Sequence, residues 1–236
     1  MKLPRLVLLL ALIAAILLLI AGPGSRMAWW DFRTGFALMK WATFAGLAAA
    51  AIALIALLVP RMRRAGARLL VPALLIGLGV AYLPFQGMVT AKAVPPIHDI
   101  TTDTAQPPAF VAILPLRKDA SNPSDYAGAE VADQQKAAYP DLQPLRLDEN
   151  PQAAFDRAAE AAKAMGWEIV ATDAASGRIE ATDTTFWFGF KDDVVVRVAA
   201  DGTGSVVDVR SVSRVGQSDV GKNASRIRAY LEKLGG

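Results

Sequence analysis

The sequence lacks cysteine altogether and contains a single histidine, His98. The absence of cysteine excludes disulfides, thiolate metal ligands, thiol nucleophiles and a lipid anchor attached through a thiol. An exported domain of this composition has to be held together by its own hydrophobic core. The single histidine argues against a Ser-His hydrolase, because the serine and threonine side chains have no base nearby in the sequence.

Recognisable catalytic and cofactor motifs are missing as well. The sequence contains neither a P-loop nor a dinucleotide-binding fingerprint. His98, Asp99 and Asp103 are too few and too loosely arranged for a closed zinc site. We interpret their segment as an anchor of the chain, with Thr101 and Thr102 bonded to nearby backbone. The sequence therefore predicts no catalytic residue, no metal and no cofactor.

Three long runs of the sequence carry no charge: residues 6–25, 41–60 and 69–91. At about 1.5 Å per helical residue, each run is long enough to cross a hydrocarbon layer of roughly 30 Å. Transporters and proton relays need polar groups within the membrane, whereas here Lys40 stands at the edge of a run. We predict a three-span anchor over residues 1–91. Its small residues suit close helix contact: Gly46, Ala49, Ala50, Gly77 and Gly79.

Acidic residues are scarce in the same part of the chain. Residues 1–90 carry nine basic residues and one acid, whereas residues 91–236 carry sixteen basic residues and twenty-one acids. The isoelectric point near 9.3 therefore belongs to the membrane part and does not indicate a nucleic-acid partner.

The distribution of basic residues also predicts an orientation. Four arginines fall in the loop 61–68, which is a strong cytoplasmic signal, and Lys2 and Arg5 place the N-terminus on the same side. Three crossings then leave the C-terminal domain periplasmic or extracellular, in a multi-pass protein of the plasma (inner) membrane. Cleavage of the first run as a signal peptide would leave this location unchanged, and no clean cleavage motif follows it.

Residues 92–149 have the composition of a connector. Nine of the fourteen prolines fall between Pro95 and Pro151, and proline disfavours both a helix and a central strand. The apolar segment Phe110–Leu114 is expected to dock on the domain as an edge strand. Ser121–Tyr139 has little apolar content and is expected to be mobile.

Residues 150–236 have the pattern of a compact α+β domain. Asn150 is a good helix N-cap and Pro151 fits the first helical position. A final helix is expected from Asp219 to Leu234. The full prediction is three N-terminal transmembrane helices followed by a helix, a four-strand antiparallel meander and a helix. The expected strands are Trp167–Ala171, Arg178–Phe188, Asp193–Ala199 and Ser205–Ser213.

The segment Arg210–Ile227 holds many small polar and charged residues at a strand-to-helix junction. It resembles the signature of the domain of unknown function 1499 family. Ile97–Asp103, Gly166–Val170 and Phe188–Val198 also fit that family, so that the resemblance covers roughly residues 94–235. The resemblance implies an envelope domain, often behind membrane spans, whose activity is unassigned, and it brings no catalytic residues.

This polar junction has two interpretations. Its arginines and hydroxyls could bind an anionic or polar ligand beside a helix start. Alternatively, Ser218 or Asp219 caps the helix, and the other side chains satisfy one another as a structural network. We favour the structural interpretation and keep both. The candidate residues are Arg210, Ser211, Ser213, Arg214, Ser218, Asp219, Asn223 and Arg226.

Two further patterns concern the expected strands. The aromatic residues Phe186, Trp187, Phe188 and Phe190 suit either an exposed patch or a core, since alternation does not bury all four. Asp192 and Asp193 are neighbours on a strand and therefore point to opposite faces, which argues against a catalytic carboxylate pair.

Together these features predict a binding or scaffolding module of the cell envelope rather than an enzyme. The partners expected are the lipid bilayer and, through the spans, another membrane protein. The alternatives are an enzyme that acts on an envelope lipid or glycan, using Asp219, Ser218 and the arginines, and an accessory subunit of a membrane complex.

Overall fold

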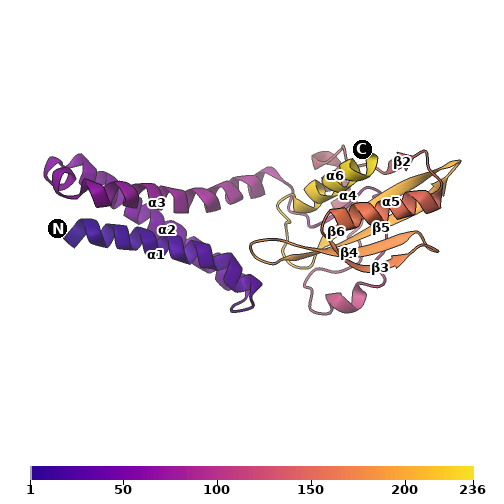
Figure 1. Cartoon of the computed structure of the whole chain (residues 1–236), viewed down its shortest axis with the longest axis horizontal. Helices are drawn as coiled ribbons and strands as arrows, with labels where there is room; N and C mark the ends of the chain where they lie inside the picture. The colour runs from indigo at the N-terminus through magenta and orange to yellow at the C-terminus, as the bar shows by residue number, and fades with distance from the viewer. Residues whose placement is uncertain (1) are drawn as a thin grey trace. The chain divides into compact units, whose positions relative to one another are not determined.

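The computed structural model of the protein describes residues 2–236, which divide into two compact units (Figure 1). The helical unit contains the chain up to Thr90 together with the short segment Phe186–Gly189. The sheet unit contains Ala91–Thr185 and Phe190–Gly236.

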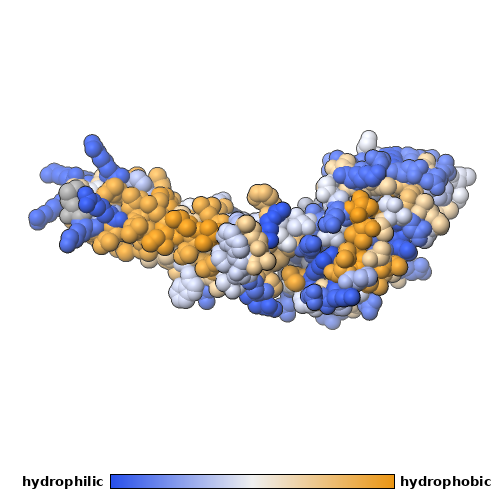
Figure 2. Space-filling model, turned by 60° about the horizontal axis from the view of Figure 1, so that its bottom comes forward, coloured by the Kyte–Doolittle hydropathy of each residue, from blue (hydrophilic) through white to orange (hydrophobic). Residues whose placement is uncertain are grey.

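The helical unit is built on α1 (Lys2–Arg26), α2 (Phe32–Leu58) and α3 (Pro60–Ala93). All three helices are long and apolar enough to cross a membrane, as predicted. The buried residues of α2 are only glycine and alanine, whereas large side chains such as Trp41 and Ile55 face outward. Figure 2 shows hydrophobic side chains over the outer surface of these helices. An arrangement with small residues inside and large residues outside is typical of helices that pack against one another in lipid.

Two glycines bring α2 and α3 together. A Cβ atom on Gly77 would lie 2.4 Å from the carbonyl oxygen of Gly46 and 3.1 Å from the Cβ atom of Ala50. Only glycine fits at this crossing. The expectation for Gly79 is wrong, because an added Cβ there would have no atom within 4 Å.

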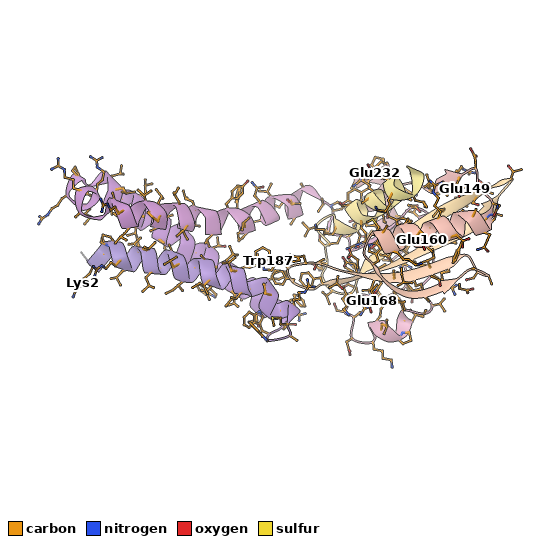
Figure 3. The ribbon with its side chains drawn as sticks, viewed as in Figure 1. Lys2, Glu149, Glu160, Glu168, Trp187 and Glu232 are labelled. Atoms are coloured by element: carbon orange, nitrogen blue, oxygen red, sulfur yellow. The ribbon has the colours of Figure 1, made fainter. Side chains whose placement is uncertain are left out.

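The aromatic segment divides between packing and exposure. Trp187 (labelled in Figure 3) packs against an apolar cluster to which all three helices contribute. The ring of Phe188 lies 5.0 Å from that of Phe36, whereas Phe186 is 91% exposed. These residues form the turn between two strands, so strand alternation does not apply to them.

The sheet unit contains the predicted meander and two additional strands. The meander consists of β3 (Glu168–Asp173), β4 (Arg178–Thr184), β5 (Lys191–Asp201) and β6 (Gly204–Ser213), all antiparallel. The short strands β1 (Asp99–Thr101) and β2 (Leu145–Leu147) both pair with β6. The sheet order is β1-β6-β5-β4-β3, and the α+β class is confirmed.

Helices α5 (Pro151–Ala164) and α6 (Lys222–Gly235) cover one face of this sheet (Figure 1). The Asn150 side chain accepts a hydrogen bond from the Ala153 amide at 3.1 Å, as expected of an N-cap. Helix α6 begins at Lys222 instead of Asp219, because Val220 and Gly221 have φ angles of 55° and 78°. Such left-handed residues interrupt a helix.

The connector covers the second face of the sheet. Phe110 and Ile113 are buried there against Val195 and Val212. The expected edge strand is wrong, because this segment turns into a short 3₁₀ helix, Leu114–Arg117. Its amide groups point at a buried carboxylate, described below, and are not available to a neighbouring strand.

Helix α4 (Ala129–Ala138) forms within the segment expected to be mobile. No proline interrupts the chain between Pro123 and Pro140, so a helix is permitted there. Its Gln135 side chain is buried and bonds to the backbone of Thr101, donating at 2.6 Å and accepting at 2.9 Å. Gln135 thus satisfies the outer edge of β1 as a further strand would.

Candidate functional site

The polar junction is divided between the two faces of the sheet. Asp192 and Asp193 point to opposite faces, as predicted for neighbours on β5: Asp192 bonds to Arg226 on one face, and Asp193 to Arg117 and Arg214 on the other. Two candidates, Arg210 and Arg214, lie on the face covered by the connector. Four candidates lie on the face covered by the helices: Ser211, Ser213, Asn223 and Arg226. The eight candidates therefore do not form one site.

Arg226 is the centre of the cluster on the helix face, and it is only 7% exposed. Its Nη2 lies 2.6 Å from Oδ2 of Asp192, and its Nε lies 2.7 Å from Oδ2 of Asp183. Its Nη1 donates to Asn223 Oδ1 at 2.5 Å and to Ser211 Oγ at 3.1 Å. All three guanidinium nitrogens are thus bonded within the protein.

Asn223 connects α6 to the sheet. Its amide nitrogen donates to the carbonyl oxygen of His98 at 2.9 Å and to Ser213 Oγ at 3.0 Å. Its amide oxygen accepts from Ser211 Oγ at 2.7 Å. The imidazole of His98 lies at the surface, with Nδ1 3.2 Å from the carbonyl oxygen of Gln217.

Asp219 closes the loop before α6. Its Oδ1 accepts from the amide of Gly221 at 2.8 Å and its Oδ2 from the amide of Asn223 at 2.6 Å. Burial raises the pKa of Asp219 above its ordinary value of 3.8, although these amide hydrogen bonds oppose the shift. Ser218 acts locally, since its Oγ accepts from the amide of Val220 at 3.1 Å.

Asp193 organises the opposite face, and its carboxylate is fully buried. Arg117 Nη1 lies 2.6 Å from Oδ2, while Arg214 bonds to both oxygens, with Nε at 2.9 Å and Nη2 at 2.8 Å. The Thr182 hydroxyl adds a bond of 2.8 Å. One carboxylate therefore joins β5, β4, the end of β6 and the connector.

Arg210 holds the connector further along the same face. It forms a two-pronged ion pair with Asp99, with distances of 2.9 and 2.8 Å, and both side chains are buried. It also donates to the carbonyl oxygens of Pro108 at 3.1 Å and Ser124 at 2.7 Å. Its guanidinium carbon lies 5.2 Å from the ring centre of Phe110.

Glu180 is a third buried carboxylate on this face. It accepts hydrogen bonds of 2.9–3.1 Å from the successive amides of Val111, Ala112 and Ile113, and Arg178 Nε lies 3.0 Å away. Sequence analysis missed Glu180 and Arg117, because their partners are 67–69 and 76 residues distant. The only local signal was that of Glu180, a charged residue on the face of β4 opposite to the apolar side chains of that strand.

A small cavity of about 200 Å³ lies beside Arg210, lined also by Phe110, Ser124 and Tyr126. Burial raises the pKa of Tyr126 to about 12, and its hydroxyl has no hydrogen-bond partner among the described residues. Pockets for small ligands usually occupy about 300–1,000 Å³, so this cavity suits only a very small molecule. Within residues 2–236, no three His, Asp or Glu side chains are grouped so as to hold a metal ion.

Comparison with known proteins identifies a family. The sequence model of the family described as proteins of unknown function, DUF1499, matches residues 99–234. The match includes every residue of the two clusters, from Asp99 to Arg226. No curated protein matches the chain.

The Asp193 cluster generates a prediction about stability. Asp193→Ala leaves Arg117 and Arg214 without their buried counter-charge and should lower the free energy of unfolding by about 3–5 kcal/mol. Arg214→Ala leaves Asp193 still bonded to Arg117 and Thr182, and should cost about 1–3 kcal/mol. The double variant should lose less than the sum.

Chemical unfolding of the full chain in mild detergent measures these three values. Arg228→Ala is the matched control, because the ion pair of Arg228 with Asp141 is exposed and is expected to contribute about 0–1 kcal/mol. Strict additivity of the Asp193 and Arg214 substitutions would contradict the coupling.

Asp219 generates a prediction about pH. Its pKa is raised in the folded protein, so protonation of Asp219 favours the folded state. The stability that Asp219 contributes is fully present below its ordinary pKa of 3.8 and is lost as the pH rises through the folded value. The free energy of unfolding of the natural protein, minus that of Asp219→Asn, should therefore fall between about pH 3 and pH 7. Urea titrations of both proteins across this range measure the difference, and a rising difference would refute the assignment.

Proposed function

The chain belongs to the DUF1499 family of proteins of unknown function, and we propose that it is a membrane-anchored binding or scaffolding module of the cell envelope. In this proposal the three helices cross the plasma membrane, and the sheet unit is presented outside the cytoplasm. The eight residues of the polar junction form a structural network rather than a ligand site.

One observation carries the structural role of the network. Each arginine of the junction is already paired with a buried carboxylate: Arg210 with Asp99, Arg214 with Asp193, and Arg226 with Asp192. An anionic ligand would have to displace one of these carboxylates and leave it buried without its partner, which costs several kcal/mol. Binding to an outside partner is therefore assigned to the outer surface of the sheet unit or to the helices.

The charge distribution supports the proposed orientation. The segment 61–68, at the start of α3, carries four arginines, and Lys2 and Arg5 begin α1. Basic residues are retained on the cytoplasmic side of a membrane. With three crossings, the proposal puts everything after α3 in the periplasm of a double-membrane cell, or outside a cell with one membrane.

One observation favours the alternative of an enzyme acting on an envelope lipid or glycan. Asp219 is buried with a raised pKa, and such carboxylates are frequent in catalytic sites. Both of its oxygens, however, accept hydrogen bonds from backbone amides of its own loop, which is the arrangement of a structural loop-closing residue.

The orientation is tested with fusions to a reporter that fluoresces only in the cytoplasm. A fusion after Gly236 should be dark, because three crossings place the C-terminus outside, whereas a fusion after Arg64 should be bright. A bright fusion after Gly236 would contradict the orientation.

The binding role is tested by gentle purification of the full chain from its own membranes, followed by mass spectrometry of what accompanies it. We expect a partner in a fixed ratio that is retained by Arg228→Ala and is not chemically altered on incubation. Steady conversion of the accompanying molecule, abolished by Asp219→Asn, would favour the enzyme instead.

A further inference from the structure

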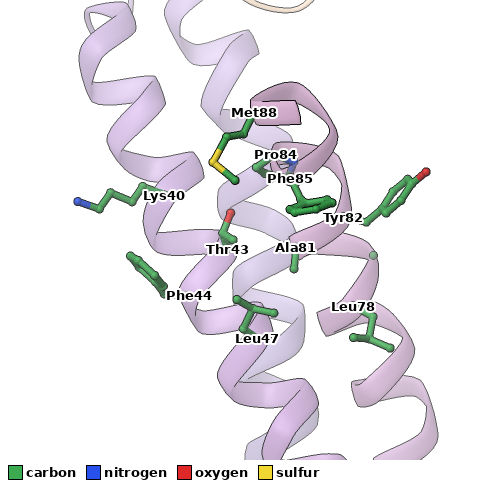
Figure 4. Close-up of a pocket in the computed structure, with 11 residues that line it drawn as sticks. Lys40, Thr43, Phe44, Leu47, Leu78, Ala81, Tyr82, Pro84, Phe85 and Met88 are labelled. Atoms are coloured by element: carbon green, nitrogen blue, oxygen red, sulfur yellow. The ribbon is translucent and has the colours of Figure 1, made fainter. Parts of the chain in front are cut away.

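The helical unit contains a groove between α2 and α3, with a volume of about 780 Å³ (Figure 4). Its walls are apolar: Phe44 and Leu47 come from α2, and Leu78, Phe85 and Met88 come from α3. The groove lies next to the crossing of Gly46 and Gly77, where the two helices touch.

The groove has the depth of one leaflet of a bilayer. From Lys40 to Leu47 the chain advances about 10 Å along α2, and from Leu78 to Met88 about 15 Å along α3. Half of a hydrocarbon core is about 15 Å. The groove therefore runs from the membrane surface next to the end of α3 to about the midplane, as one lipid chain does.

Lys40 projects from α2 at the margin of the groove (Figure 4) and has no anionic partner in the helices. The sequence contains no Asp or Glu between Asp31 and Asp99. Among the described residues Lys40 makes no ion pair, and the neighbouring Thr43 hydroxyl is bonded to the carbonyl oxygen of Met39 at 2.8 Å. Asp31, the one acid of the helical unit, caps α2 and lies beside Arg33 instead of Lys40.

We propose that this groove binds one acyl chain of an anionic phospholipid whose phosphate pairs with Lys40. The inference rests on the membrane crossing of the proposed function. Charge complementarity favours a lipid over a partner helix, because an unpaired ammonium at the membrane surface faces phosphate groups. The walls also favour a lipid, since helix contacts in membranes use small residues, whereas only three of the eleven residues that line this groove, Thr43, Gly79 and Ala81, are small.

Two glycines of α3 allow a matched test. Gly79 lines the groove, and an added Cβ there has no atom within 4 Å, so Gly79→Leu fills the groove without disturbing the helix crossing. Gly87 has the same free space but is not part of the groove, so Gly87→Leu is the control. Both substitutions favour a helix. Lys40→Gln removes the charge and keeps most of the side chain.

The measurement uses the full chain in phosphatidylcholine vesicles that contain spin-labelled phosphatidylglycerol or spin-labelled phosphatidylcholine. Electron paramagnetic resonance gives the fraction of each label that the protein immobilises. The natural protein and Gly87→Leu should prefer phosphatidylglycerol several-fold. Lys40→Gln should lose the preference, and Gly79→Leu should immobilise less of both lipids.

Equal immobilisation of the two lipids by the natural protein would overturn the proposal, as would unchanged immobilisation by Gly79→Leu. If Gly79→Leu changes the oligomeric state and leaves lipid immobilisation unchanged, the groove binds a protein partner. That result would also overturn the lipid proposal. The spin-label result does not depend on the side on which the sheet unit lies or on its partners. Failure here is therefore separate from failure of the orientation or binding tests.

Discussion

The sheet unit depends on one buried carboxylate, that of Asp193. It lies near the beginning of β5, on the second sheet face, and receives donors from the connector, from β4 and from the end of β6. Removing a charge of this kind from water is costly, and the cost is offset only when all its partners are present together. Two of these partners are Arg117 and Arg214. Because Arg117 belongs to the connector, the second face is complete only when the connector is packed on the sheet.

The two faces of the sheet are consequently held by different interactions. On the helix face, an apolar core between the sheet and helices α5 and α6 removes hydrophobic area from water and supplies most of the stabilisation. On the connector face the apolar cluster has only four buried members, and ion pairs around Asp193, Asp99 and Glu180 surround it. Buried ion pairs add little net stability but penalise wrong arrangements strongly. We interpret the charged face as the part that selects one path for a proline-rich connector.

The helical unit follows a different arrangement, and its three helices are long and apolar enough to cross a membrane. The buried residues of α2 are only glycine and alanine, and α2 and α3 approach to backbone contact at Gly46 and Gly77. The large side chains of α2, such as Trp41 and Ile55, face outward. The groove beside Lys40 lies between the same two helices, and the small residues Gly79 and Ala81 are part of its lining. Close contact and open groove are thus consequences of the same choice of residue sizes along α3.

The sequence by itself determined the three apolar helices, the α+β class and the meander, because these depend on run length and on short-range periodicity. The family was indicated separately, by the resemblance of segments such as Arg210–Ile227 to its signature. Even the opposite directions of Asp192 and Asp193 follow from the two-residue repeat of a strand. Only the tertiary structure decided that the connector covers the second sheet face, that Glu180 holds the amides of Val111 to Ile113, and that the polar junction is split in two. These features join residues 67–111 positions apart. A buried charge chooses its partners by geometry in space, and no local pattern in the chain records that choice.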